Sequence, residues 1–475
     1  MTVLAICSMS LLIVGLDVTI VNVALPAIHR SLHSSYSALQ WTIDAYTLVL
    51  ASLLMLSGST ADRIGRRRLF QIGLATFSAG SLLCALAPDA GFLIAFRALQ
   101  AVGGSMLNPV AMSIIRNVFE DPRERAQAIG VWGAMIGLSM ALGPITGGAL
   151  VDSVGWRAVF LVNVPIGVLA IILTALLVPE SRAPHARRID PLGQVLIVVG
   201  LASLTYAIIE GGDHGFGAGD VIAFFAVAMC AFAALIFHEL RTFEPLIELR
   251  FFRSAPFSGA SAIAVAAFAA MGGFLFLNTL YLQDVRGLSA LDAGLYTLPM
   301  AGMTVLLAPI SGRIVGARGA RPSMVLAALA LIASGVMLAQ IGDHTATGYL
   351  LGAYFAFGTG FGLINPPITN TAVSGMPPAQ AGVAAAVAST SRQVGQTLGV
   401  AVLGAIAAGS ATAHIGPGFA AATHPAWWVI AALGVVILAA ALASTGRWAQ
   451  RSARATAERL REGMRPQGSG AYEPA

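Results

Sequence analysis

The chain has 475 residues, of which 57% are hydrophobic and 10% are charged, and its mean hydropathy is +0.80. A soluble domain carries about 25% charged residues, so this composition excludes a soluble globular protein and predicts an all-α polytopic membrane protein. The net charge of +5 reflects 27 basic residues, all arginine, that gather in short loops, so no nucleic-acid partner is indicated. Cys7, Cys84 and Cys230 lie within apolar runs, where we expect small buried side chains and neither disulfides nor a metal site.

Fourteen apolar runs, separated by short polar gaps, follow one another along the chain. Each is long enough for a transmembrane helix, which needs about 20 residues. The predicted spans are 3–26, 37–58, 69–88, 91–115, 125–151, 157–178, 190–211, 219–239, 256–282, 289–312, 322–342, 347–374, 379–408 and 425–446. The polar tail that begins at Arg447 predicts a short amphipathic helix followed by a disordered end.

Short sequences recur after about 250 residues. Arg63-Ile64 returns as Arg313-Ile314, Asn108-Pro109 as Asn365-Pro366 and Ala126-Gln127-Ala128 as Ala379-Gln380-Ala381. Such repeats suggest duplicated halves, which are common in transporters. We therefore expect a six-helix bundle at 1–180, a two-helix insert with its linkers at 181–254, a second six-helix bundle at 255–446 and a tail at 447–475.

The distribution of arginine predicts the orientation of the chain. If the N-terminus is cytoplasmic, inner loops and the tail hold 22 of the 27 arginines and outer loops hold three. Inner loops of membrane proteins are enriched in arginine and lysine, so both termini are predicted to be cytoplasmic. Arg97 and Arg392 lie within spans, where an isolated charge costs about 3 kcal/mol or more.

The densest cluster of charge is Ala61-Asp62-Arg63-Ile64-Gly65-Arg66-Arg67-Arg68, between the second and third spans. Gly65 permits a tight turn, and Asp62 can face the positive N-terminus of a helix. Arg66 and Arg67 can bind anionic lipids or the carboxylates of a neighbouring helix. The cluster resembles the signature loop of the major facilitator superfamily, which implies a conformational gate; a charge cluster that only sets topology is the alternative.

Two further motifs resemble the same superfamily. Arg97-Ala-Leu-Gln100, followed by Asn108-Pro109, resembles the motif of its fourth helix. Arg97 needs a carboxylate or several carbonyl partners there, unless it reaches the outer surface. Gly143-Pro144-Ile-Thr-Gly147-Gly148 resembles the fifth-helix motif of antiporters, in which glycine allows close helix contact and proline adds a kink. This resemblance implies a second gate at Gly143, Pro144, Gly147 and Gly148.

Several segments resemble one branch, the fourteen-helix drug:proton antiporters. They include Leu16-Asp17-Val-Thr-Ile-Val-Asn22, Trp41-Thr-Ile-Asp44, Phe160-Leu-Val-Asn163 and Arg392-Gln393. The resemblance covers essentially the whole chain. It implies a major facilitator fold of two six-helix bundles and a two-helix insert, in a bacterial cell membrane.

Asp17 and Asp44 are the only carboxylates that fall well inside spans of the N-terminal half. Burial favours the protonated form of a carboxyl group and a nearby arginine favours the ionised form, so such a group can bind and release a proton. We expect Asp17, Asp44 and Arg97 to couple transport to protons. The alternatives are a structural, hydrogen-bonded Asp17 and an Asp44 that lies in water near the outer end of its span.

Polar side chains within the spans predict a substrate cavity between the bundles, near the bilayer midplane. The candidates are Asn22, Gln100, Asn108, Asn163, Asn365, Arg392 and Gln393. Acids that a related multidrug exporter carries in the C-terminal half are replaced here by Thr304, Ala388, Ser389 and Gln393, which favours a neutral or monovalent substrate. Arg392 can attract an anionic group or bond to backbone carbonyls.

The predicted function is proton-coupled antiport that exports a small, mostly apolar drug or antibiotic by alternating access. An exporter of an endogenous lipid, siderophore or secondary metabolite, and a proton-coupled importer, are the alternatives. No enzyme is predicted, and a chain without lysine cannot form a nucleotide-binding Walker motif. We expect no cofactor beyond the proton as coupling ion, no metal, membrane lipids as partners and a monomer.

Overall fold

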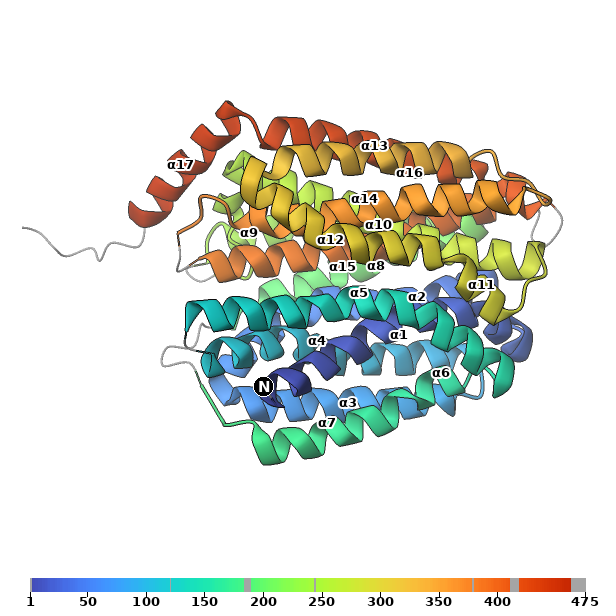
Figure 1. Ribbon diagram of the computed structural model, residues 1–475, viewed down its shortest axis with the longest axis horizontal. Coiled ribbons are helices and arrows are strands. Elements are labelled where there is room, and N and C mark those ends of the chain that lie inside the picture. The colour runs from blue at the N-terminus through green and yellow to red at the C-terminus, as the bar shows by residue number, and fades with distance from the viewer. Residues whose placement is uncertain are drawn as a thin grey trace, which may run out of the picture.

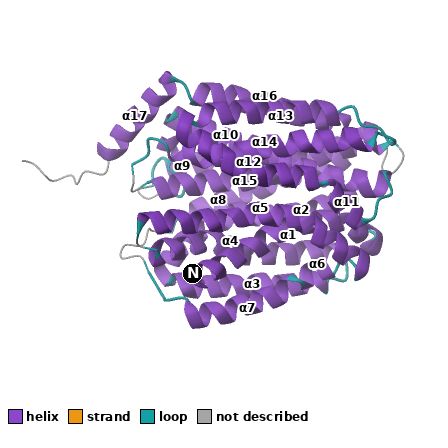
Figure 2. Cartoon of the chain, in the orientation of Figure 1, coloured by secondary structure: helices purple, strands orange, loops and turns teal. Residues whose placement is uncertain are grey.

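The computed structural model describes residues 2–119, 121–182, 189–242, 245–377, 380–410 and 418–462. Within these ranges every regular element is a helix, and the long helices run roughly parallel to one another (Figures 1 and 2). This arrangement suits a membrane, because a helix satisfies all its backbone hydrogen bonds internally. The predicted all-helical architecture is confirmed.

The N-terminal bundle contains seven helices that lie together in the lower part of Figure 1. α3 packs against α4 and α7, α2 packs against α4, and α1 packs against α5. The helices are α1 (Thr2–Leu32), α2 (Tyr36–Ile64), α3 (Arg66–Ala85), α4 (Ala90–Val118), α5 (Pro122–Ser153), α6 (Ala158–Leu161) and α7 (Asn163–Leu177).

The C-terminal bundle lies above it in Figure 1, with α10 packed against α15, α14 and α16. It comprises α10 (Ala255–Leu280), η2 (Tyr281–Val285), α11 (Ala290–Tyr296), α12 (Leu298–Arg318), α13 (Ala320–Leu338), α14 (Thr347–Val373), α15 (Ala381–Ser410) and α16 (Phe419–Ser444). The predicted tail helix is present as α17 (Arg447–Glu462), which packs against α10 and the short helix η1 (Leu249–Arg253).

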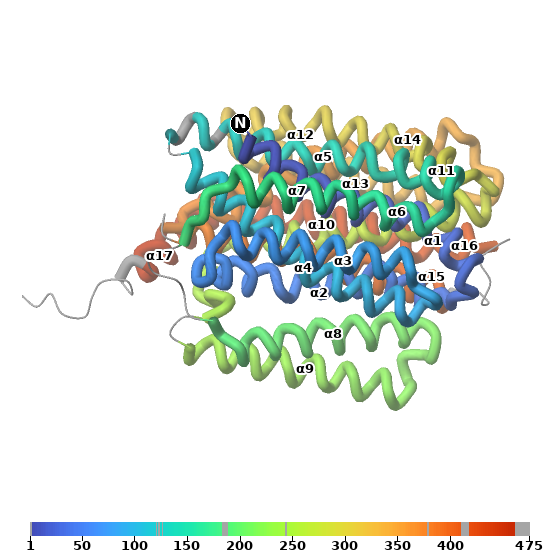
Figure 3. Tube along the Cα trace, turned by 90° about the horizontal axis from the view of Figure 1, so that it is seen from below, coloured from blue at the N-terminus to red at the C-terminus, as the bar shows by residue number. Residues whose placement is uncertain are grey.

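The insert consists of α8 (Pro191–His214) and α9 (Gly219–Glu239), which pack against each other. Figure 3 shows both helices on one flank, outside the two bundles, and α8 contacts α2 and α15. The insert therefore touches both halves. The outer side of α9 is exposed, so the expectation that all three cysteines are buried is wrong: Cys7 and Cys84 are buried, but Cys230 is exposed.

Three predicted spans that contain proline differ from the helices, and proline interrupts the helix in two of them. The predicted end of the first span at residue 26 is wrong, because α1 continues through Pro26 to Leu32. Two predicted spans are each divided: α6 and α7 meet at Val162, and α11 and α12 meet at Thr297. Pro165 and Pro299 follow shortly after these breaks, and proline cannot donate the backbone hydrogen bond that would continue a helix.

Thirteen helical stretches of the described residues are long and apolar enough to cross a membrane. The remaining predicted span corresponds to α15, which is as long as its neighbours but carries a polar run at Ser389–Gln393. The number fourteen therefore stays a prediction. Some predictions concern residues outside the described ranges. These are Arg187 and Arg188 of a predicted inner loop, Ala379 of the repeat, and 463–475 of the predicted disordered end.

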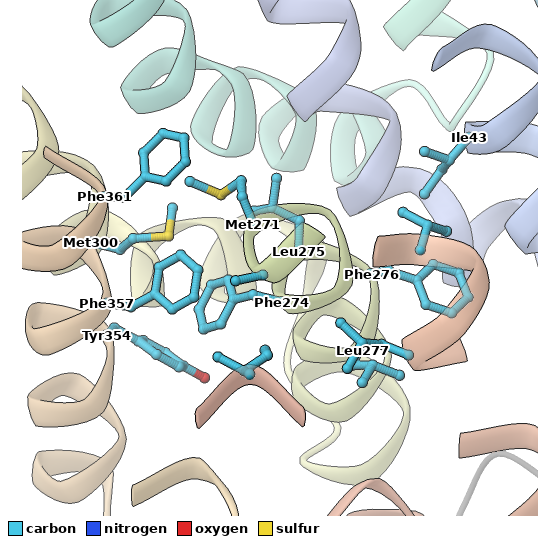
Figure 4. Packing of buried hydrophobic residues seen from close by; sticks show 14 of the residues in the cluster. Ile43, Met271, Phe274, Leu275, Phe276, Leu277, Met300, Tyr354, Phe357 and Phe361 are labelled. Atoms are coloured by element: carbon cyan, nitrogen blue, oxygen red, sulfur yellow. The ribbon is translucent and has the colours of Figure 1, made fainter. Parts of the chain in front are cut away.

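The largest apolar core is built around α10 and continues into the N-terminal bundle (Figure 4). Phe274 stacks on Phe357 of α14, with ring centroids 4.2 Å apart, and meets Tyr354 edge-on at 5.5 Å. Phe276 meets Tyr36 of α2 edge-on at 5.4 Å. Aromatic packing thus holds α10 between its own bundle and the other half.

The helices end at two opposite faces of the molecule, a basic face and a distal face. The basic face contains the start of α1, the loop at 62–68 and α17, at the left of Figure 1. The distal face contains the end of α5 and the start of α11, at the right of Figure 1.

Candidate functional site

Five buried polar residues of α1, α3, α4 and α7 form one hydrogen-bonded group, which we call the Asp17 cluster: Asp17, Ser81, Arg97, Gln100 and Asn163. Arg97 Nη1 lies 2.5 Å from Asp17 Oδ2 in a salt bridge. Asp17 Oδ1 accepts hydrogen bonds from Gln100 Nε2 at 2.8 Å and Asn163 Nδ2 at 2.9 Å. Both amides also donate to Ser81 Oγ. No member is more than 1% exposed, so the cluster joins four helices in the core of one bundle.

Arg97 makes two further hydrogen bonds and a cation–π contact. Its Nε donates to the carbonyl oxygen of Thr42 at 3.1 Å, and its Nη1 also donates to Gln100 Oε1 at 2.8 Å. Its guanidinium carbon lies 4.2 Å from the centre of the Tyr46 ring, a cation–π distance. The prediction that Arg97 needs a carboxylate or several carbonyl partners is confirmed, because it contacts the Asp17 carboxylate and the Thr42 carbonyl. The alternative of an arginine that reaches the outer surface is wrong.

Asp44 of α2 is also buried, at 0% exposure, but it lies outside the Asp17 cluster. Its Oδ1 accepts a 3.4 Å hydrogen bond from Thr47 Oγ1, and its Oδ2 has no partner among the described residues. Thr397 of α15 donates to Thr47 Oγ1 at 2.8 Å, which connects this position to the other bundle. The alternative of an Asp44 that lies in water is wrong in this conformation, because α15 and the insert cover this side of α2.

The loop on the basic face is held by an acid other than the predicted one. Asp62 pairs with Arg66 at 3.0 Å across the turn between α2 and α3, and it accepts no backbone N–H group of α3 in the described structure. Glu180 has that position: its two carboxylate oxygens accept the backbone N–H groups of Arg67 and Arg68 at 3.1 and 3.2 Å. A carboxylate there neutralises the positive end of α3.

Gly65 makes this arrangement possible. Its φ of +114° lies in a region that side chains rarely adopt, and a Cβ atom would lie 2.8 Å from the Glu180 carboxylate. Sequence reasoning missed Glu180. The available signal was its position directly after Pro179, at the end of the sixth span and on the predicted side of the Arg66 loop.

The glycine motif of α5 meets two different neighbours. Gly143 and Gly147 lie against Thr19 and Ile20 of α1, inside the same bundle. Gly148 instead faces the other half, where an added Cβ would lie 2.5 Å from the carbonyl oxygen of Ala290 in α11. Pro144 belongs to this second contact as well, because its carbonyl oxygen lies 2.3 Å from the Cβ position of Gly294. The motif thus serves packing within one bundle and close approach between the two.

Charged groups reinforce the contact between halves on the distal face. The Asp152 carboxylate accepts the backbone N–H groups of Ala290 and Leu291 at 3.2 and 2.9 Å, at the N-terminus of α11. Arg30 of α1 lies 3.1 Å from Asp284 of η2. The distal ends of the two bundles are therefore in direct contact in this conformation.

The predicted cavity residues do not all come together. Gln100 and Asn163 belong to the Asp17 cluster. Asn22 is 2% exposed and donates to the Val18 carbonyl in its own helix, leaving its Oδ1 without a partner in the described structure. Asn108 and Asn365, the repeated pair, are both partly buried on α4 and α14.

Arg392 lies in the other half and has no acidic partner within 4.0 Å among the described residues. Its Nη1 donates to Ser389 Oγ at 3.5 Å, and its Nη2 donates to Thr369 Oγ1. Its Nε has no hydrogen-bond partner in the described structure, and neither has the adjacent Gln393 Oε1. The alternative of an arginine bonded to backbone carbonyls does not describe this site, because its hydrogen-bond partners among the described residues are the hydroxyl groups of Ser389 and Thr369.

Comparison with known proteins identifies the family of the chain. Residues 7–400 match the family model described as Major Facilitator Superfamily. "Multidrug resistance protein Stp" of Mycobacterium tuberculosis is 36% identical over 409 residues, which cover 86% of this chain and 76% of that protein. "Methylenomycin A resistance protein" of Bacillus subtilis is 32% identical over 445 residues, which cover 93% of this chain and 94% of that protein. "Tetracenomycin C resistance and export protein" of Streptomyces glaucescens is 36% identical over 403 residues, which cover 84% of this chain and 74% of that protein.

Solved structures support the same fold. A protein described in "Structural insights into substrate recognition in proton dependent oligopeptide transporters" superposes with a TM-score of 0.66 at 15% identity, covering 97% of this chain and 99% of that one. A bacterial homologue of the human lysosomal transporter Spinster, in an inward-facing conformation, superposes with a TM-score of 0.63 at 18% identity. The superposition covers 96% of this chain and 97% of that one. Identities this low indicate the fold alone. The predicted transporter class, as opposed to an enzyme, is confirmed: the chain belongs to the major facilitator superfamily.

Proposed function

We propose that this protein exports small, mostly apolar drugs or antibiotics in exchange for protons, from the inner membrane of a bacterium. The names of its relatives, which refer to multidrug and antibiotic resistance, support the export of drugs. The observation that carries the proton-coupled part is Asp44, a buried carboxyl group with one oxygen unpaired among the described residues, at a helix that meets the other bundle.

Asp17 and Asp44 have different roles in this proposal. Asp17 accepts hydrogen bonds from two amides and pairs with the guanidinium of Arg97, so it holds Arg97 in place. Asp44 has no cation beside it in the described structure, and an ionised carboxylate there loses its hydration without compensation. Its proton binding and release therefore depend on whether the site is open to water. We assign the coupling proton to Asp44 and a positioning role to Asp17.

The contacts between the bundles support transport by alternating access. The distal contacts of Gly148 and Asp152 close one side, and opening that side requires both to break. If the basic face is cytoplasmic, this conformation prevents exchange with the outside. A proton that moves down about 100 mV supplies about 2.3 kcal/mol, enough for roughly 50-fold accumulation of a substrate.

Transport by Asp44→Asn in proteoliposomes tests the proposal. The amide keeps the size and the acceptor oxygen but cannot exchange a proton. We expect export driven by a pH gradient to fall at least 100-fold, while exchange of substrate without a gradient persists. Asp89→Asn is the matched control, because Asp89 lies at the exposed N-cap of α4 and asparagine caps a helix equally well.

Full gradient-driven export by Asp44→Asn would contradict the role of Asp44. The same assay decides the direction: substrate that moves with the proton, and not against it, would identify an importer.

A panel of antibiotics and dyes, tested for resistance in a host that lacks its own efflux pumps, identifies the substrate. Resistance to none of them, together with transport of a lipid or siderophore, would favour an endogenous substrate.

A further inference from the structure

A cavity of about 320 Å³ lies on the flank of the molecule, between the insert and the C-terminal bundle. Leu201 of α8, Leu235 of α9, Phe252 of η1 and Val387 of α15 are among the residues that line it. Thr390 and Ser391 are the polar members of its described lining. The volume is at the lower end of the range of about 300–1,000 Å³ that is typical of ligand pockets.

The cavity opens toward the surroundings of the protein. Ile236 of α9 and Phe252, which both line it, are 52% and 44% exposed. The adjacent outer side of α9 carries further exposed apolar residues, Met229 and Phe237. A surface of this kind on a membrane-spanning helix faces lipid. A molecule that enters the cavity therefore comes from the bilayer.

Positive charge lies next to this opening. η1 carries Arg250 and Arg253 directly beside the lining residues Leu249 and Phe252. The Arg250 side chain is 65% exposed, and its nearest acid, Glu248, lies 3.7 Å away. Arg253 is exposed and has no ion pair within the described structure. An apolar cavity with two exposed arginines on one of the segments that line it suits a molecule with an apolar chain and an anionic head.

We propose that this cavity binds an anionic phospholipid, with one acyl chain inside it and the phosphate on Arg250 and Arg253. The basic face, to which η1 belongs, is the predicted cytoplasmic side, where a membrane surface is rich in anionic lipid. The acyl chain fills the space between α8, α9 and α15. The lipid thus joins the insert to the helix whose Thr397 contacts Thr47.

Native mass spectrometry of the full-length protein, titrated with phosphatidylglycerol or phosphatidylcholine, tests this site. We expect one phosphatidylglycerol to bind more tightly than phosphatidylcholine. Each arginine near a net anionic head group contributes about fivefold to the affinity, so Arg250→Gln/Arg253→Gln should weaken the binding of phosphatidylglycerol about 30-fold. The binding of phosphatidylcholine, whose phosphate charge is offset by its choline group, should weaken much less. Arg313→Gln/Arg318→Gln removes two exposed arginines from the same face and should have no effect.

Filling the cavity tests the position of the acyl chain. Leu204→Trp, at a partly exposed lining position, should weaken both lipids at least tenfold. Ile236→Trp, at the rim, is a second variant in case the first fails to fold. Leu326→Trp adds the same bulk to an exposed position of α13 and should change neither affinity. Equal binding of the two lipids to the wild type, or unchanged phosphatidylglycerol binding in the arginine or tryptophan variants, would overturn the assignment.

Discussion

Two acids that look alike in the sequence have opposite environments. Asp17 and Asp44 both lie well inside apolar spans, and both are buried. Arg97 and two amides surround Asp17, whereas Asp44 receives one hydrogen bond, from Thr47. A buried charge is stable when it is paired and hydrogen-bonded, so the surroundings of Asp17 compensate a negative charge and those of Asp44 do not.

The ion pair predicts a stability effect at the residue scale. Asp17→Asn or Arg97→Gln leaves the other partner charged and buried, which costs about 3–5 kcal/mol. Each variant should therefore insert into the membrane but unfold at a clearly lower temperature in detergent, with loss of export. The double variant Asp17→Asn/Arg97→Gln should be less destabilised than either single variant, because no unpaired charge remains. Additive losses of stability would show that the two groups are not coupled.

At the scale of elements, the turn between α2 and α3 depends on residues from three segments. The salt bridge of Asp62 and Arg66 spans the end of α2 and the start of α3, while Glu180 arrives from beyond α7. Gly65 leaves room for that carboxylate. The loop is thus tied to the end of its bundle.

Arg66→Ala and Glu180→Gln should slow turnover and leave substrate affinity unchanged, because the loop does not contact the predicted cavity. Loss of the charged cap in Glu180→Gln should also destabilise α3 by about 0.5–2 kcal/mol. Transport rates at saturating and limiting substrate separate turnover from affinity. Arg68→Ala, which removes an exposed side chain from the same loop, is the control. Equal turnover in all variants would reduce the loop to a signal for topology.

At the scale of the whole molecule, the two bundles touch closely on the distal face because of glycine. Gly148 and Gly294 bring α5 and α11 within backbone contact, and Asp152 then reaches the N-terminus of α11. A side chain at either glycine cannot be accommodated without moving one bundle. The balance between closed and open states is therefore sensitive to single substitutions here.

Gly148→Val should shift this balance toward the state that is open on the distal face. In a background without Cys7, Cys84 and Cys230, a cysteine at Leu291 should react faster with a water-soluble maleimide when Gly148→Val is present. Gly130→Val is the matched control, because a Cβ at Gly130 of the same helix meets no atom within 4 Å. A similar labelling rate in both variants would refute a role of Gly148 in closure.

The helical membrane class could be predicted from the sequence alone, because long apolar runs and the placement of arginine depend on local composition. It also singled out Asp17, Arg97, Gln100 and Asn163, since polar groups are rare in apolar spans. Which of them pair depends on the three-dimensional packing. Asp17 pairs with Arg97, 80 positions away in the sequence, one oxygen of Asp44 has no partner among the described residues, and Glu180, not Asp62, lies at the start of α3. These outcomes depend on how helices distant in sequence rotate and pack against one another, and hydropathy does not encode that rotation.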